Sequence, residues 1–307
     1  MTPEEALKTL EERATHLQDV EYEEIMYLLQ HGIRRIPIPV GKLYRGALID
    51  RVRPNDGKNL FANIDDLTYI KKEQIIREKL TEFGRGNCPH QPMFYGAIES
   101  TEIPQQRITA LAETSTLYQN PAGVNIEGEL YTVSRWRTTE ELQVAEMVFS
   151  PGAIAASQDT AKAFQNQVVL LAAQGVGDEA FLREFLVFVS GQFARHKQTH
   201  HDYKISAAYT NAVLQHPNIS GVSYPSVQTG YQGWNLVLPP AIVEQALTLE
   251  SAITQRLYKN APYMFVNNHM ECVNPLSDPQ ELNWLPTNPV HIAGQKEIHA
   301  GLHLPSN

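Results

Sequence analysis

The chain has 307 residues, 42% of them hydrophobic and 19% charged, a composition typical of a globular protein with a sizeable core. Lys and Arg total 25 against 34 Asp and Glu, and the net charge of −9 disfavours a nucleic-acid-binding protein, which needs a basic face. The acidic start has no signal-peptide pattern, and no stretch approaches the roughly 20 apolar residues of a membrane helix. With two cysteines, Cys88 and Cys272, we expect a reduced, cytoplasmic protein with no membrane or nucleic-acid partner.

The first 32 residues are expected to form a helical extension. Thr2 can cap a helix, Pro3 suits its first turn, and Glu5 completes a capping box. Apolar residues then recur at helical spacing until His31 and Gly32 supply a C-terminal stop. This pattern predicts two short helices or one bent helix.

Changes of periodicity predict the elements of the remaining chain. Strands are expected at 42–46, 93–96, 130–137, 222–224 and 234–238, with a final aromatic strand near 258–266, and helices at 71–79, 107–114, 160–174, 179–196, 205–214 and 241–247. No repeat or linker divides the chain, so one domain is predicted over residues 33–270. It follows the extension at 1–32 and precedes an irregular tail at 271–307.

Two common catalytic motifs are incomplete. The segment Gly84-Arg85-Gly86 lacks the third glycine and the strand-to-helix context of a dinucleotide-binding fingerprint. The segment Gly221-Val222-Ser223 lacks the second glycine of a nucleophile elbow, so a Rossmann enzyme and a serine hydrolase are both disfavoured.

A histidine cluster raises the question of a metal site. His196 and His200 are four residues apart, a spacing that would place both rings on one helical face. The cluster lacks the Glu of a metalloprotease helix, and Lys197 adds positive charge beside it. We therefore favour an exposed basic helix end and predict no metal.

Several separated segments resemble the RES family, which is named for its Arg, Glu and Ser. In family order they are Leu43-Tyr44-Arg45-Gly46, Gly84-Arg85-Gly86-Asn87, Met93-Phe94-Tyr95, Thr109-Ala110-Leu111-Ala112-Glu113 and Gly221-Val222-Ser223-Tyr224-Pro225-Ser226. The segments at 203–207 and 235–238 also fit, so the resemblance covers about residues 42 to 245. Each segment is short, and it is their order and spacing that make the combination specific.

The resemblance implies an α+β, ADP-ribosyltransferase-like RES fold with a mixed β-sheet core flanked by helices. It implies an enzyme that takes NAD as substrate, without a metal or other cofactor, and cleaves the nicotinamide–ribose bond as a glycohydrolase or phosphorylase. It also implies a toxin whose partner is an antitoxin protein. A mono-ADP-ribosyltransferase and a catalytically inactive RES-like binding module remain open alternatives. The sequence decides neither homo-oligomerisation nor the role of the N-terminal helices.

The residue types in these segments suit NAD cleavage. Planar guanidinium groups bind a pyrophosphate with paired hydrogen bonds, a role for which Arg45 and Arg85 are the candidates. Loss of nicotinamide leaves oxocarbenium character on the ribose, which a fixed carboxylate stabilises. We therefore assign Glu113 and Arg45 to the catalytic centre.

Three further residues are expected to bind substrate. Tyr44 and Tyr95 offer flat faces and hydroxyl groups, and Ser226 can hold a ribose hydroxyl or help to position Glu113. Structural alternatives exist for each assignment. Arg45 and Glu113 can form a structural ion pair, Tyr95 can be a core residue, and Ser226 can cap a turn.

The sequence also departs from the family pattern. Glu99 and Glu102 precede Glu113 in a long intervening stretch, so either can be mistaken for the catalytic carboxylate. The Ala-Leu-Ala context favours Glu113. Gln228 stands where some relatives carry Arg, which puts a second phosphate contact in doubt.

Overall fold

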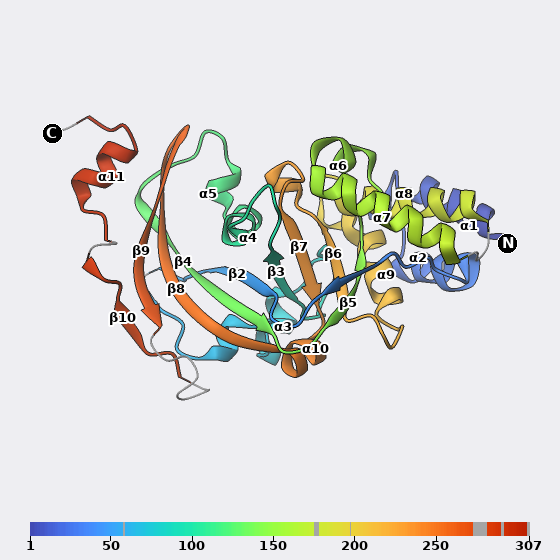
Figure 1. The fold of residues 1–307 in the computed structure, drawn as a ribbon, viewed down its shortest axis with the longest axis horizontal. Coiled ribbons are helices and arrows are strands. Elements are labelled where there is room, and N and C mark those ends of the chain that lie inside the picture. The colour runs from blue at the N-terminus through green and yellow to red at the C-terminus, as the bar shows by residue number, and fades with distance from the viewer. Residues whose placement is uncertain (58, 175–177, 197, 273–280, 290–291, 306–307) are drawn as a thin grey trace.

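A long, curved β-sheet organises the chain (Figure 1). The computed structural model describes residues 1–57, 59–174, 178–196, 198–272, 281–289 and 292–305. In this described part the sheet has ten strands in the order β1-β5-β6-β7-β3-β2-β4-β8-β9-β10, and only the β5–β6 pair is parallel. The strands are β1 (Val40–Leu43), β2 (Leu48–Pro54), β3 (Phe94–Ile98), β4 (Val124–Thr138), β5 (Leu142–Glu146), β6 (Gly221–Pro225), β7 (Trp234–Leu238), β8 (Leu247–Asn260), β9 (Tyr263–Cys272) and β10 (Trp284–Pro286).

Helices flank this mixed sheet, which confirms the predicted α+β class. Figure 1 shows α4 and α5 in the hollow of the curved sheet, α1, α2, α7 and α8 grouped at one end, and α11 beside β9 at the other. The helices are α1 (Pro3–Arg13), α2 (Tyr22–Tyr27), α3 (Glu73–Lys79), α4 (Gln106–Thr114), α5 (Thr116–Gln119), α6 (Pro151–Ala156), α7 (Gln158–Gln174), α8 (Glu179–Ala194), α9 (Lys204–Val213), α10 (Pro240–Ala246) and α11 (Gln295–Gly301). Short 3-10 and π-helical turns lie between them, including Leu17–Asp19, Leu28–Ile33 and His200–Tyr203.

Successive side chains of β3 and β7 belong to two different hydrophobic cores, one on each face of the sheet. Phe94 of β3 and Leu236 of β7 pack with Val243 of α10 on one face of the sheet. The paired neighbours Tyr95 and Val237 turn to the other face and pack with the core that contains α8 and α9. Because successive side chains of a strand point to opposite faces, Tyr95 faces the helices around the candidate site.

The N-terminal helices begin as predicted and belong to the main core. Thr2 Oγ1 accepts a hydrogen bond from Glu5 N at 3.2 Å, and Thr2 N donates to Glu5 Oε2 at 2.8 Å, which completes the capping box. Leu10 and Ile25 are fully buried in one cluster with Phe185 of α8. Each such side chain contributes roughly 1.5–3 kcal/mol by burial, so the first 32 residues are a packed part of the fold.

The structure corrects several sequence predictions. No strand was expected at β2 or β5, yet β2 lies between β3 and β4, and β5 lies between β1 and β6. The final aromatic strand is two strands, β8 and β9, joined by a turn at Ala261-Pro262. The tail predicted as irregular from residue 271 contains β10 and α11, because Trp284 pairs with Cys272 and Ile298 packs against Tyr258.

Candidate functional site

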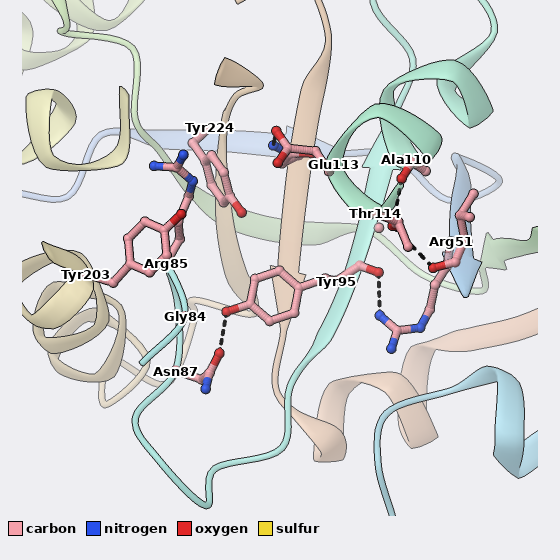
Figure 2. A pocket seen from close by; sticks show the side chains of 13 residues that line it. Arg51, Gly84, Arg85, Asn87, Tyr95, Ala110, Glu113, Thr114, Tyr203 and Tyr224 are labelled. Atoms are coloured by element: carbon pink, nitrogen blue, oxygen red, sulfur yellow. Dashed lines mark hydrogen bonds between the residues drawn. The ribbon is translucent and has the colours of Figure 1, made fainter. Parts of the chain in front are cut away.

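A cavity of about 250 Å³ lies beside α4. Its lining residues come from β2, β3, α4, β6 and β7, from the segment between α3 and β3, and from the turn that precedes α9 (Figure 2). They are Arg51, Val52, Gly84, Arg85, Asn87, Tyr95, Gly96, Ala110, Glu113, Thr114, Tyr203, Tyr224 and Asn235. Three of the six site residues predicted from the sequence, Arg85, Tyr95 and Glu113, therefore line one cavity.

Glu113 is held through one of its two carboxylate oxygens. Its Oε1 accepts hydrogen bonds from Ser226 Oγ at 2.6 Å and from Asn235 Nδ2 at 2.8 Å. Within the described residues, Oε2 has no hydrogen-bond donor, and no Arg or Lys forms an ion pair with this carboxylate. The carboxylate is thus fixed in direction while one oxygen stays available to a ligand.

Local structure explains why Glu113 and Ser226 meet. Ala110, Leu111 and Ala112 are buried against the sheet, so the next residue of α4 is carried to the edge of the helix that borders the cavity. Ser226 directly follows β6 and is fully buried, and its backbone N donates to Gly233 O at 2.7 Å. Ser226 therefore holds one carboxylate oxygen of Glu113, the contact expected if it helps to position that side chain.

Arg85 lines the cavity, and backbone carbonyl groups partly offset its positive charge. Its Nη1 donates to the carbonyl oxygens of Phe193 at 2.6 Å and Arg195 at 3.2 Å, at the C-terminal end of α8. Carbonyl groups at a helix C-terminus carry partial negative charge and stabilise a buried cation. The guanidinium also lies 4.9 Å from the centroid of the Tyr203 ring. These stacked side chains form one side of the cavity, the Arg85–Tyr203 wall.

The Tyr95 hydroxyl is occupied by the protein. It donates to Asn87 Oδ1 at 2.6 Å, as Figure 2 shows, and accepts from Gly86 N at 2.9 Å. Gly84 permits this arrangement, because a Cβ there would lie 2.3 Å from Asn87 Oδ1. Burial raises the pKa of the Tyr95 phenol, so it stays neutral. Tyr95 can therefore offer a ligand its ring.

Arg51 is a cavity residue that the sequence did not single out. Its Nη1 donates to Tyr95 O at 2.6 Å, while its Nε is buried without a hydrogen-bond partner in the described structure. Burial, with a smaller contribution from repulsion by Arg53, lowers the pKa of the Arg51 guanidinium to about 9. The guanidinium is half-buried and lies 5.2 Å from the centroid of the Phe94 ring, and a partly desolvated cation without a carboxylate gains from a ligand that supplies the opposite charge.

Tyr44 and Arg45 lie in the turn between β1 and β2, away from this cavity. The Tyr44 side chain is 69% exposed. Arg45 lines a different hollow together with Arg137 and Glu250, which form an ion pair at 2.5 Å. The structure therefore brings neither residue to Glu113, and Arg45 and Glu113 do not form the structural ion pair that was the alternative.

We expect Arg45→Ala to leave the cavity chemistry intact. Because Arg45 is exposed and lines another hollow, its loss should change kcat/KM for any reaction in the cavity beside α4 by no more than about twofold, the factor that 0.5 kcal/mol represents. Steady-state kinetics of the purified variant measure this. A loss of 100-fold or more would instead restore Arg45 to the catalytic centre.

The competing carboxylates lie elsewhere. Glu102 accepts hydrogen bonds from Ser157 Oγ at 2.5 Å and Gln158 N at 3.1 Å, at the junction of α6 and α7. Glu99 is exposed and lines a separate hollow that also contains Lys42. Glu113 is thus the only one of the three glutamates to line the cavity beside α4.

Contrary to the sequence prediction, the histidine cluster does not continue helix α8 but is divided between the residues just after α8 and a separate 3-10 turn at His200–Tyr203. Helix α8 ends at Ala194, so His196 and His200 do not share a helical face. His200 stacks on Phe83 with ring centroids 6.1 Å apart, and Lys197 lies outside the described residues. Across the described residues, no group of three or more His, Cys, Asp or Glu side chains is arranged to hold a metal ion.

Asn87, Tyr203, Tyr224 and Asn235 were recognised only as parts of motifs, and their place in the cavity was not predicted. Asn235 lies within a strand of apolar residues, and a polar side chain at a buried strand position was the available signal. For Arg51 the signal was weaker, since Asp50, Arg51 and Arg53 give β2 little apolar alternation.

No protein-family model matches this chain, and no curated protein matches it. None of the helices in the described ranges is long and apolar enough to cross a membrane.

Proposed function

We propose that this chain is a RES-type enzyme with an ADP-ribosyltransferase-like fold that cleaves the nicotinamide–ribose bond of NAD. The observation that carries the proposal is Glu113, whose Oε1 is held by Ser226 and Asn235 while Oε2 is left to a ligand. Positive charge grows on the ribose as nicotinamide departs. A carboxylate already fixed in direction stabilises that charge without reorganising, which favours the transition state over the bound substrate.

The charge of the cavity suits an anionic substrate. Two guanidinium groups, Arg51 and Arg85, line it against one carboxylate, Glu113. Arg51 keeps a buried N–H without a partner, and this group is suited to a phosphate oxygen. The pyrophosphate of NAD supplies such oxygens next to the ribose that is attacked.

Size and shape support the same substrate. A volume of about 250 Å³ lies just below the roughly 300 Å³ at which pockets for whole small molecules begin. The cavity therefore fits one end of a dinucleotide, with the other end extending outside. The rings of Tyr95, Tyr203 and Tyr224 offer faces for a planar, positively charged nicotinamide.

The bond changes are simple. The bond between ribose C1 and the nicotinamide nitrogen breaks, and both electrons leave with nicotinamide, which becomes neutral. An oxygen of water or of phosphate forms the new bond to C1; water loses a proton in this step, whereas a deprotonated phosphate oxygen has none to lose. Glu113 Oε2 is the group of this chain placed to hold a ribose hydroxyl or to receive that proton.

The proposal is tested with purified protein and NAD, with and without inorganic phosphate. We expect nicotinamide release, with free ADP-ribose as the second product in water and a phosphorylated ADP-ribose if phosphate is the acceptor. NAD labelled in the adenosine part separates these outcomes from ADP-ribosyl transfer, in which label stays on an acceptor. Failure to release nicotinamide under every condition, while NAD still binds, would instead identify an inactive binding module.

A further inference from the structure

A buried lysine connects the N-terminal segment to the cavity. Lys204, the first residue of α9, is 6% exposed, and its ammonium donates to Leu17 O at 2.9 Å and Val20 O at 2.6 Å. In the described part of the chain no carboxylate lies within ion-pair distance of this ammonium. Since a buried ammonium is costly without hydrogen bonds, the two carbonyl groups fix where the Lys204 side chain lies.

Lys204 also contacts both segments that build the Arg85–Tyr203 wall. It directly follows Tyr203, and its Nζ lies 5.8 Å from the centroid of the Phe83 ring, two residues before Arg85. Phe83 N donates to His200 Nδ1 at 3.4 Å, which ties these two segments together. The Lys204 ammonium thus interacts with two segments that are distant from it in sequence.

A second connection reinforces the first. Arg195 donates through Nη1 to Ala14 O at 3.5 Å and pairs through Nη2 with Asp202 Oδ1 at 3.3 Å. The carbonyl oxygen of the same Arg195 accepts from Arg85 Nη1. The N-terminal segment therefore reaches Arg85 through backbone and side-chain bonds.

We propose that Lys204 is a positioning residue, which holds the Arg85–Tyr203 wall in place by anchoring it to the N-terminal segment at Leu17 and Val20. The N-terminal helices are then part of the substrate-binding apparatus. This inference rests on the proposed function of the cavity. Lys204 sets how tightly NAD is held, whereas Glu113 on α4 governs the rate of bond cleavage.

The test compares Lys204→Met with Lys259→Met. Lys259 is a matched control: it is 4% exposed and donates to the carbonyl oxygens of Leu117, Tyr118 and Asn120, beside α5 and outside the cavity lining. We expect K204M to raise the KM for NAD about tenfold with kcat nearly unchanged, and K259M to alter neither. K204R, which keeps the cation and its donors, should restore most of the affinity.

Hydrogen exchange of the free protein gives a result independent of NAD. In K204M the backbone amides of Gly84–Asn87 and His200–Tyr203 should exchange faster than in K259M, because the wall loses its anchor. If wild-type protein does not act on NAD but this difference appears, the proposed function fails and the positioning role stands. Equal exchange in the two variants, or a fall in kcat with unchanged KM in K204M, overturns the positioning role.

Discussion

Glu113→Gln is expected to lower kcat for nicotinamide release about 100- to 1,000-fold while leaving the KM for NAD within a few-fold of wild type. Glutamine keeps a carbonyl oxygen that can accept the hydrogen bonds from Ser226 and Asn235, so the side chain stays in place. What the variant loses is the negative charge on the oxygen that faces the cavity. That charge matters most when the ribose becomes positive, in the transition state.

The measurement is a comparison of steady-state kinetics with those of Glu99→Gln. Glu99 undergoes the same chemical change, but it is exposed and lines a different hollow, so its kinetics should match wild type within about twofold. Thermal unfolding of both variants checks that the folds are intact. Full activity in the Glu113 variant, or an equal loss in both, would remove the carboxylate from the mechanism.

Local signals in the sequence predicted the part of the site on α4, β6 and β7. Buried Ala110, Leu111 and Ala112 favour a helix and fix its packed face, so the position of Glu113 follows from helical geometry. The motif with Ser226 directly follows the apolar strand β6. These elements were predictable because the residues that decide them are neighbours in the chain.

The position of Arg45 and the existence of β2 were not predictable in the same way. Arg45 lies in the turn before β2 and Arg51 in the middle of β2, and only the pairing of β2 with β3 brings Arg51 to the cavity. The strand contains Asp50, which is buried because Arg135 of β4 binds it through two hydrogen bonds of 2.7 Å. Arg135 lies 85 residues from Asp50 in the sequence, so the residues around β2 give no local sign of a strand.

The hydrogen-bond partners of Lys204 could not be predicted for the same reason, because they are distant from it in the sequence. Its sequence neighbours indicate an ordinary helix start, whereas the carbonyl groups that hold its ammonium lie more than 180 residues earlier. The capping box and the glycine stop predict a helical extension over residues 1–32. The shared core with α8 and α9 is a property of the tertiary fold and has no local pattern.

Arg51→Met should have opposite effects on substrate binding and on stability. Without the guanidinium, NAD should bind at least about 30-fold more weakly, the factor that 2 kcal/mol represents, because its phosphate loses a buried cationic partner. The free protein should unfold at an unchanged or higher urea concentration at pH 7. Arg51 is half-buried and its Nε has no partner in the described structure, and replacing such an incompletely paired charge with an apolar side chain of similar length is often neutral or stabilising.

The pH dependence of unfolding tests whether the charge of Arg51 is what lowers the stability of the wild-type protein. In the folded protein the pKa of Arg51 is lowered to about 9, whereas the unfolded chain keeps its proton to far higher pH. The unfolded state therefore binds more protons above pH 9, and the wild type gains stability from this group as the pH rises through that value. Any stability advantage of the Met variant should be complete at pH 7 and smaller at pH 10.

Arg53→Met is the matched control on the same strand. Arg53 also has a lowered pKa, and like Arg51 it donates through Nη1 to a backbone oxygen, that of Asp66, and lies over an aromatic ring, that of Phe61. Unlike Arg51, it does not line the cavity. Its loss should leave NAD binding unchanged. Calorimetric titration with NAD, carried out with Glu113→Gln also present in each chain so that NAD is bound but not cleaved, and urea unfolding at the two pH values measure both variants. If Arg51→Met bound NAD normally and unfolded at lower urea, Arg51 would be a structural residue, and the cavity would lose the cation that most favours an anionic substrate.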